Sequence, residues 1–69
     1  MVTLEQIQER LAEEIIHSGM SQTKIAKKIG VSQQAVSSYV RRCKMPAFDT
    51  FANLCRLLDL DANYILFLQ

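Results

Sequence analysis

Residues 21–42, with the sequence SQTKIAKKIGVSQQAVSSYVRR, constrain the fold most, because two helix starts lie close together with one glycine between them. Ser21 and Ser32 each precede an apolar run, and a serine hydroxyl there accepts a hydrogen bond from a free amide of the first helical turn. Gly30 directly follows the first run, which is typical of a left-handed residue that ends a helix. The stretch therefore predicts two short helices joined by a tight turn.

The apolar residues of this stretch have the spacing of a helix-turn-helix. Ala26 is small enough to let the second helix come close, Gly30 makes the turn, and Val36 packs the second helix against the first. This combination describes a helix-turn-helix that binds DNA. The side chains left outside on the second helix can all donate hydrogen bonds and none is acidic: Ser32, Gln33, Gln34, Ser37, Ser38, Arg41 and Arg42. Such a surface is suited to base edges and phosphates.

The chain resembles the Cro/repressor type of helix-turn-helix protein found in lambdoid phages. The matching segments are MSQTKIAKKIGVSQQAVSSYV, the single proline Pro46, and FDTFANLCRLLDLDANYIL, which together cover nearly the whole chain. The resemblance implies one all-α domain over residues 1–69, a compact bundle of five helices in which the second and third form the helix-turn-helix. It also implies that the third helix enters the major groove of double-stranded DNA.

The resemblance also supplies candidate DNA contacts. Gln33 and Gln34 match a pair of glutamines that reads bases in some phage repressors, and Ser37 and Ser38 fall on the same side one turn later. A glutamine amide offers a donor and an acceptor that match adenine N6 and N7, so we expect an adenine under Gln34. The residues expected to contact phosphate, some from the resemblance and some from their charge, are Gln22, Lys24, Lys28, Ser32, Arg41, Arg42 and Lys44.

A net positive charge is confined to the helix-turn-helix and the loop after it. The whole chain carries +1, but residues 21–46 carry +6, residues 1–20 carry −3 and residues 47–69 carry −2. The six cations are Lys24, Lys27, Lys28, Arg41, Arg42 and Lys44. A solvated lysine face is the plain alternative. Because the cluster coincides with the helix-turn-helix spacing, we interpret it as a nucleic-acid surface.

The C-terminal residues suggest an interface with a second copy. Asp61 is placed to cap a last short helix, ANYILFLQ, and residues 64–68 are all apolar. A short terminal helix cannot bury every side, and exposed apolar patches commonly mark interfaces. We therefore expect a homodimer through Tyr64, Ile65, Phe67 and Leu68. The alternative is a tail that folds back on the core.

Two other patterns concern the core and the cellular compartment. Phe48, Phe51 and Leu54 recur at helical spacing after Pro46, which places the aromatic pair in the core. The two cysteines, Cys43 and Cys55, make no disulfide framework, which favours a reducing cytoplasm.

Together these features predict a sequence-specific DNA-binding transcriptional regulator. The resemblance favours a phage- or prophage-type repressor that binds a palindromic operator as a dimer. No cofactor, metal, membrane segment or small-molecule ligand is expected, and the sequence lacks the nucleophile–base set of an enzyme. The alternative is a protein-interaction module with the same fold, such as an antitoxin or adaptor, although that role needs no acid-free basic motif.

Overall fold

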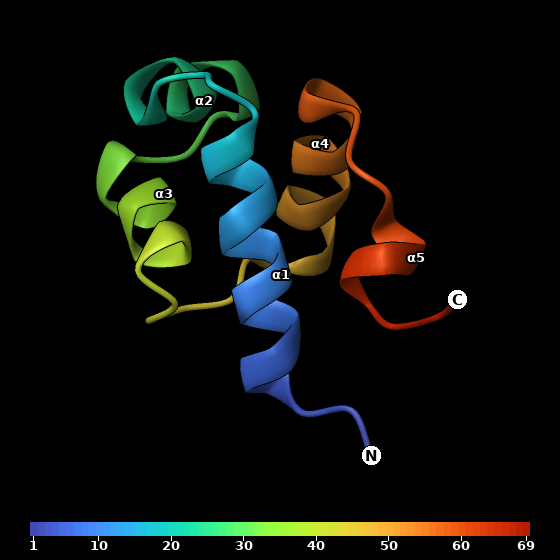
Figure 1. Cartoon of the computed structure of the whole chain (residues 1–69). Helices are drawn as coiled ribbons and strands as arrows, with labels where there is room; N and C mark the ends of the chain where they lie inside the picture. The colour runs from blue at the N-terminus through green and yellow to red at the C-terminus, as the bar shows by residue number, and fades with distance from the viewer.

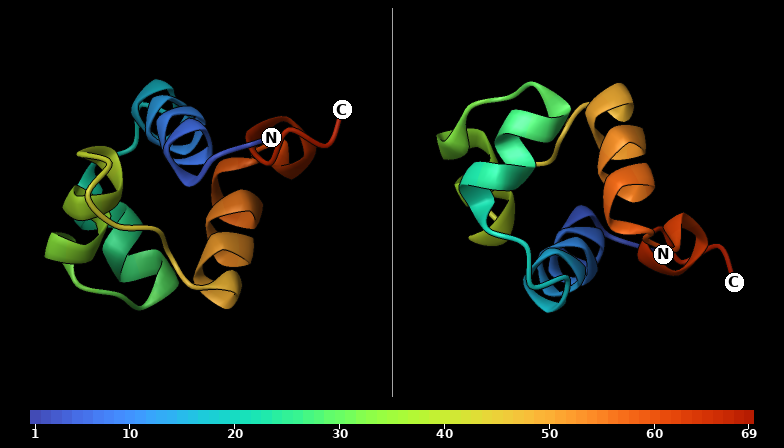
Figure 2. Two further views of the ribbon diagram at one scale, coloured as in Figure 1. Left: turned by 90° about the horizontal axis from the view of Figure 1, so that it is seen from below. Right: turned by 90° about the horizontal axis from the view of Figure 1, so that it is seen from above.

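The structure is a computed structural model that describes residues 1–69 as five helices without a strand. The helices are α1 (Leu4–His17), α2 (Gln22–Ile29), α3 (Gln33–Val40), α4 (Phe48–Leu58) and α5 (Ala62–Ile65). In Figure 1, α1 runs through the middle, with α2 and α3 to one side and α4 and α5 to the other. In both views of Figure 2, α5 lies beside α4, on the side of the protein away from α2 and α3. The predicted all-α fold is confirmed.

Side-chain caps define where four of the helices begin. Thr3 forms a complete capping box with Gln6 before α1. The hydroxyls of Ser21 and Ser32 accept hydrogen bonds from backbone amides three residues on, each at 3.1 Å. Asp61 caps α5 in the same way. These bonds satisfy amides that have no partner inside the helix, so short helices can start at defined residues.

The turn between α2 and α3 has the conformation that the sequence predicted. Gly30 has a φ of 76° and its amide bonds to the carbonyl of Ala26. That conformation is unfavourable for residues with a β-carbon, whereas glycine adopts it readily. The chain then turns within two residues and begins α3 after Ser32.

The core lies where α1, α2, α3 and α4 meet, and α5 closes one end of it. Ala26 and Val36 are both buried, and α2 and α3 pack against each other. The other large side chains of the core come from all five helices: Leu11, Ile15, Ile25, Tyr39, Phe51, Leu54 and Ile65. No helix has the length and apolarity to cross a membrane.

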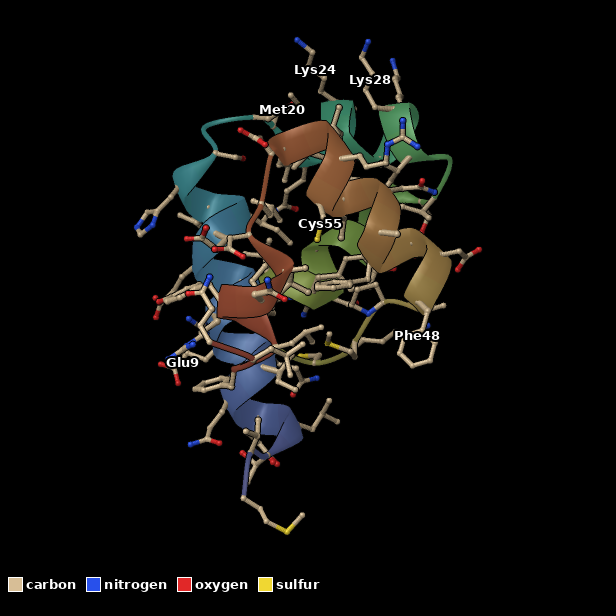
Figure 3. The ribbon with its side chains drawn as sticks, turned by 90° about the vertical axis from the view of Figure 1, so that its right-hand side faces the viewer. Glu9, Met20, Lys24, Lys28, Phe48 and Cys55 are labelled. Carbon is tan, nitrogen blue, oxygen red and sulfur yellow. The ribbon has the colours of Figure 1, made fainter.

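Phe48 corrects the expectation that both aromatic residues of this segment lie in the core. Its side chain is 94% exposed, whereas Phe51 is 8% exposed. Phe48 is the first residue of α4, and Figure 3 shows its ring pointing away from the body of the protein. The helical spacing was identified correctly, but the first turn of α4 extends past the core, so only Phe51 reaches it.

The C-terminal segment also differs from the expectation. Helix α5 ends at Ile65, so it is shorter than the predicted ANYILFLQ, because Phe67 takes a left-handed φ of 60° and turns the chain. Ile65 is fully buried (0% exposed), which removes it from any surface that a second copy could reach. Phe67 is half-buried because the tail folds back on α1. Tyr64 and Leu68 remain exposed, at 40% and 68%.

Candidate nucleic-acid interface

Helix α3 presents one polar face, because its apolar residues hold the opposite side in the core. Val36 and Tyr39 are buried. The four residues predicted to contact bases lie on the other side, where Gln33 and Gln34 are exposed and Ser37 and Ser38 are half-buried. The two glutamines occupy the first turn of the helix, directly after the cap. The structure therefore brings all four together on the outer face of α3.

Two serine hydroxyls, one on this face and one at the cap of α3, already make a local hydrogen bond. The hydroxyl of Ser38 donates to the carbonyl of Gln34 at 3.0 Å, so its oxygen is left mainly as an acceptor. The hydroxyl of Ser32 instead accepts from the amide of Ala35 at 3.1 Å. Its proton is thus free to donate outward, as a phosphate contact would require.

All six cations of residues 21–46 are exposed: Lys24, Lys27, Lys28, Arg41, Arg42 and Lys44. Figure 3 shows Lys24 and Lys28 extending outward at the α2 end of the protein. Gln22, the remaining residue predicted to contact phosphate, is the half-buried first residue of α2. Three of these cations lie on α2 and three in the segment that follows α3. A small domain with this many cations on both sides of one helix has the electrostatic character of a nucleic-acid surface.

The two arginines at the end of α3 are held differently. The Nε of Arg41 donates to the carbonyl of Ser37 at 3.4 Å, which draws its guanidinium back along the helix. Arg42 has a left-handed φ of 61° and turns the chain out of α3. Both side chains remain exposed. The two neighbouring cations therefore stand on different backbone conformations at this helix end.

The side chains with displaced pKa values lie on the buried sides of the helices. Burial raises the pKa of the hydroxyl of Tyr39, a buried residue of α3. Burial likewise raises the pKa of the Cys55 thiol on α4. Both groups are therefore neutral near pH 7 and act in packing.

Two surface features were not identified from the sequence as candidate functional residues. One is the exposed Phe48 at the start of α4. The other is Arg10 on α1, whose guanidinium lies against α5. The only signal for Arg10 was that it is the single Lys or Arg in residues 1–20. Its partners are far away in the sequence, so no local spacing could reveal them.

The family comparison agrees with this geometry. The model of the helix-turn-helix family matches residues 11–65, from the middle of α1 to the end of α5. The chain therefore belongs to the Cro/C1-type helix-turn-helix family, a family of DNA-binding domains of transcription regulators. The resemblance noted in the sequence is confirmed. Searches of curated proteins and of solved structures found no match to the chain.

Proposed function

We propose that this chain is a sequence-specific transcriptional regulator of the phage- or prophage-repressor type, acting in the cytoplasm. One observation carries the proposal: the outer face of α3 is polar and free of acid, and exposed cations flank it on α2 and on the following loop. In this family geometry the N-terminal end of the third helix approaches base edges in the major groove. The first turn of α3 holds Gln33 and Gln34 at that end.

We assign base contacts to the outer face of α3 and phosphate contacts to its surroundings. Gln34 pairs with an adenine through its amide, Gln33 reads or supports an adjacent base pair, and Ser37 and Ser38 lie over the next step. The phosphate contacts come from Gln22, Lys24, Lys28, Ser32, Arg41, Arg42 and Lys44. Contacts of this second kind position the protein but carry no sequence information.

A single α3 covers only a short stretch of DNA, so we propose that two copies bind a palindromic operator. Dimers of this type place their recognition helices about 34 Å apart, one turn of DNA. The exposed Tyr64 and Leu68, with the accessible part of Phe67, form the contact between the copies. This surface belongs to α5 and the tail, on the other side of α1 from α3 (Figure 1).

Selection of binding sites from random DNA duplexes tests the proposal. The expected product is an inverted repeat with half-site centres about 10 base pairs apart. Each half-site should contain an adenine at one fixed position. Enrichment of an unrepeated half-site would contradict the dimer, and no enrichment at all would contradict sequence-specific binding.

The salt dependence of binding separates this function from a protein-interaction role. If four cations of each copy contact phosphate, a dimer neutralises about eight phosphates. The slope of log affinity against log salt should then be about −7, from roughly −0.9 per phosphate. A slope shallower than about −2 would favour an adaptor that meets DNA only incidentally.

A further inference from the structure

The turn that follows α5 places a phenylalanine at a left-handed position that is usually occupied by glycine. The amide of Leu68 bonds to the carbonyl of Asn63 at 2.8 Å, and the amide of Phe67 bonds to the carbonyl of Tyr64 at 3.3 Å. This pair of hydrogen bonds ends a helix with a left-handed residue, which is usually glycine. Phe67 holds that conformation at a φ of 60°. A bulky residue there is strained, so other contacts must hold it in place.

Arg10 supplies those contacts from α1. Its guanidinium carbon lies 3.4 Å from the centre of the Phe67 ring and 4.2 Å from the centre of the Tyr64 ring. Its Nη1 also donates a hydrogen bond of 2.6 Å to the carbonyl of Tyr64. Cations attract the faces of aromatic rings, and the attraction grows when water is excluded. One side chain thus fixes both aromatic residues and the backbone between them. We call this arrangement the Arg10 clasp.

The clasp determines which side chains of the tail face outward. Because Phe67 is turned toward Arg10, the next residue, Leu68, is turned to solvent and is 68% exposed. Tyr64 remains 40% exposed. A second hydrogen bond, from Gln69 to the carboxylate of Asp61 at 3.0 Å, ties the end of the tail to the start of α5.

We infer that Arg10 is a positioning residue for self-association: by holding Phe67 in its left-handed turn, it presents Tyr64 and Leu68 to a second copy of this chain. The inference rests on the proposed dimer. A second copy fits because the presented side chains carry no charge and the cation beside them is already covered by two rings. Such a patch can face its own copy across a two-fold axis, because Tyr64 and Leu68 bring no charge of their own to the contact. The six exposed cations of residues 21–46 would not allow this.

The first test removes the charge of Arg10 but keeps the length of its side chain. Arg10→Met should raise the dimer dissociation constant about tenfold in sedimentation equilibrium, an effect of the size expected for a partly desolvated cation–π contact. Arg56→Met is the matched control, because Arg56 is an exposed arginine on α4, outside the clasp. It should change the constant by less than about twofold.

The second test separates positioning by Phe67 from direct contact by its ring. Phe67→Gly loses the ring but adopts the left-handed turn freely, whereas Phe67→Ala loses the ring and keeps the strain. If the turn presents Leu68, the glycine variant should dimerise more tightly than the alanine variant. Equal weakening of the two would overturn the inference, because it would show that only the ring matters.

All constants are compared at a temperature at which circular dichroism shows every variant fully helical. A wild-type dimer that Arg10→Met leaves unchanged overturns this inference and leaves the proposed function standing. A wild-type chain that remains monomeric even on its selected site overturns the proposed dimer and this inference with it. At concentrations at which both variants are dimeric, binding to random DNA should be the same for Arg10→Met and Arg56→Met, because neither changes residues 21–46.

Discussion

The helix-turn-helix and the α1–α5 end of the protein differ in how far along the chain their defining contacts reach. In the helix-turn-helix, Ser21, Gly30 and Ser32 each bond to backbone groups within four residues. At the α1–α5 end, Arg10 bonds to a carbonyl 54 residues away. A local pattern predicts the first region because the contacts are themselves local. The contacts of the second region depend on how the whole chain has packed, so a local pattern does not predict them.

The two regions also expose different chemistry. Residues 21–46 present six cations and a row of amides and hydroxyls. The α5 end presents Tyr64 and Leu68, beside a cation that is already covered. One surface is therefore suited to a polyanion and the other to an apolar surface. Four predictions test this contrast, beginning with the largest effect.

The largest effect should come from the packing that holds the helix-turn-helix to the rest of the protein. Ile25 on α2 is fully buried, so Ile25→Ala should lower the free energy of unfolding by about 2–5 kcal/mol. That is a large part of the stability of so small a domain. Urea unfolding measures the change. The control is Ile16→Ala, at an exposed isoleucine of α1, which should stay within about 0.5 kcal/mol of wild type. Similar losses at both positions would contradict the placement of Ile25 in the core.

The next effect concerns the base-reading face. Gln34→Ala should cost about 1–3 kcal/mol of binding free energy on the selected site, because the adenine loses both hydrogen bonds. It should cost almost nothing on random DNA, where phosphates supply the affinity. Competition assays on matched and base-substituted duplexes measure both values. Asn53→Ala, at an exposed amide of α4, is the control and should change neither. An equal loss on both duplexes would show that Gln34 does not read sequence.

A smaller effect tests the charge difference between the two regions. Lys28→Gln should weaken binding to every sequence alike and reduce the salt slope by about 0.9 for each phosphate that the variant no longer neutralises. The matched change Arg56→Gln, outside residues 21–46, should leave the slope unaltered. Titrations at several salt concentrations give the slopes. If both variants reduce the slope equally, the overall charge of the protein governs binding, and residues 21–46 are not a preferred phosphate-binding segment.

The smallest effect depends on pH and comes from the buried side of α3. Burial raises the pKa of Tyr39 above its ordinary value of 10.0, so the unfolded chain loses this proton at a lower pH than the folded protein. The resulting stability is present below about pH 10 and is lost as the pH rises through the raised pKa. Tyr39→Phe should therefore lose less stability than wild type as the pH rises through this range. If the free energy of unfolding falls equally with pH in both proteins, Tyr39 does not cause the loss of stability at alkaline pH. Both proteins are compared in a Cys55→Ala background, because the raised pKa of Cys55 acts in the same direction.

The contrast between local and distant contacts also explains which predictions the structure confirmed. Caps and the glycine turn place α2 and α3 close to the predicted limits, because each signal acts on the nearest helical turn. The arrangement of the polar residues on α3 follows directly from helical periodicity. The roles assigned to them, and the single domain over residues 1–69, stay predictions.

The two errors, at Phe48 and in the C-terminal segment, have the same cause: a local sequence pattern does not contain the distant contacts that decide burial. Phe48 fits the helical period of the core residues, but periodicity does not tell how far the core extends along α4. Ile65 and Leu68 both follow Asp61 in one apolar run, yet one is fully buried and the other is largely exposed. The difference arises at Phe67, whose left-handed turn depends on Arg10. No pattern confined to the C-terminal segment contains that information.

The non-glycine residues that end helices in the left-handed conformation bear on thermal adaptation. Helix α2 ends at a glycine, but the corresponding turns after α3, α4 and α5 use Arg42, Asp59 and Phe67. Each of the three departs from the residue that the turn prefers, so the chain lies below the stability that its fold allows. Arg42 is a proposed phosphate contact, and Phe67 belongs to the clasp. Asp59 has neither role, so a lineage moving to a hotter habitat could replace it with glycine without disturbing either surface.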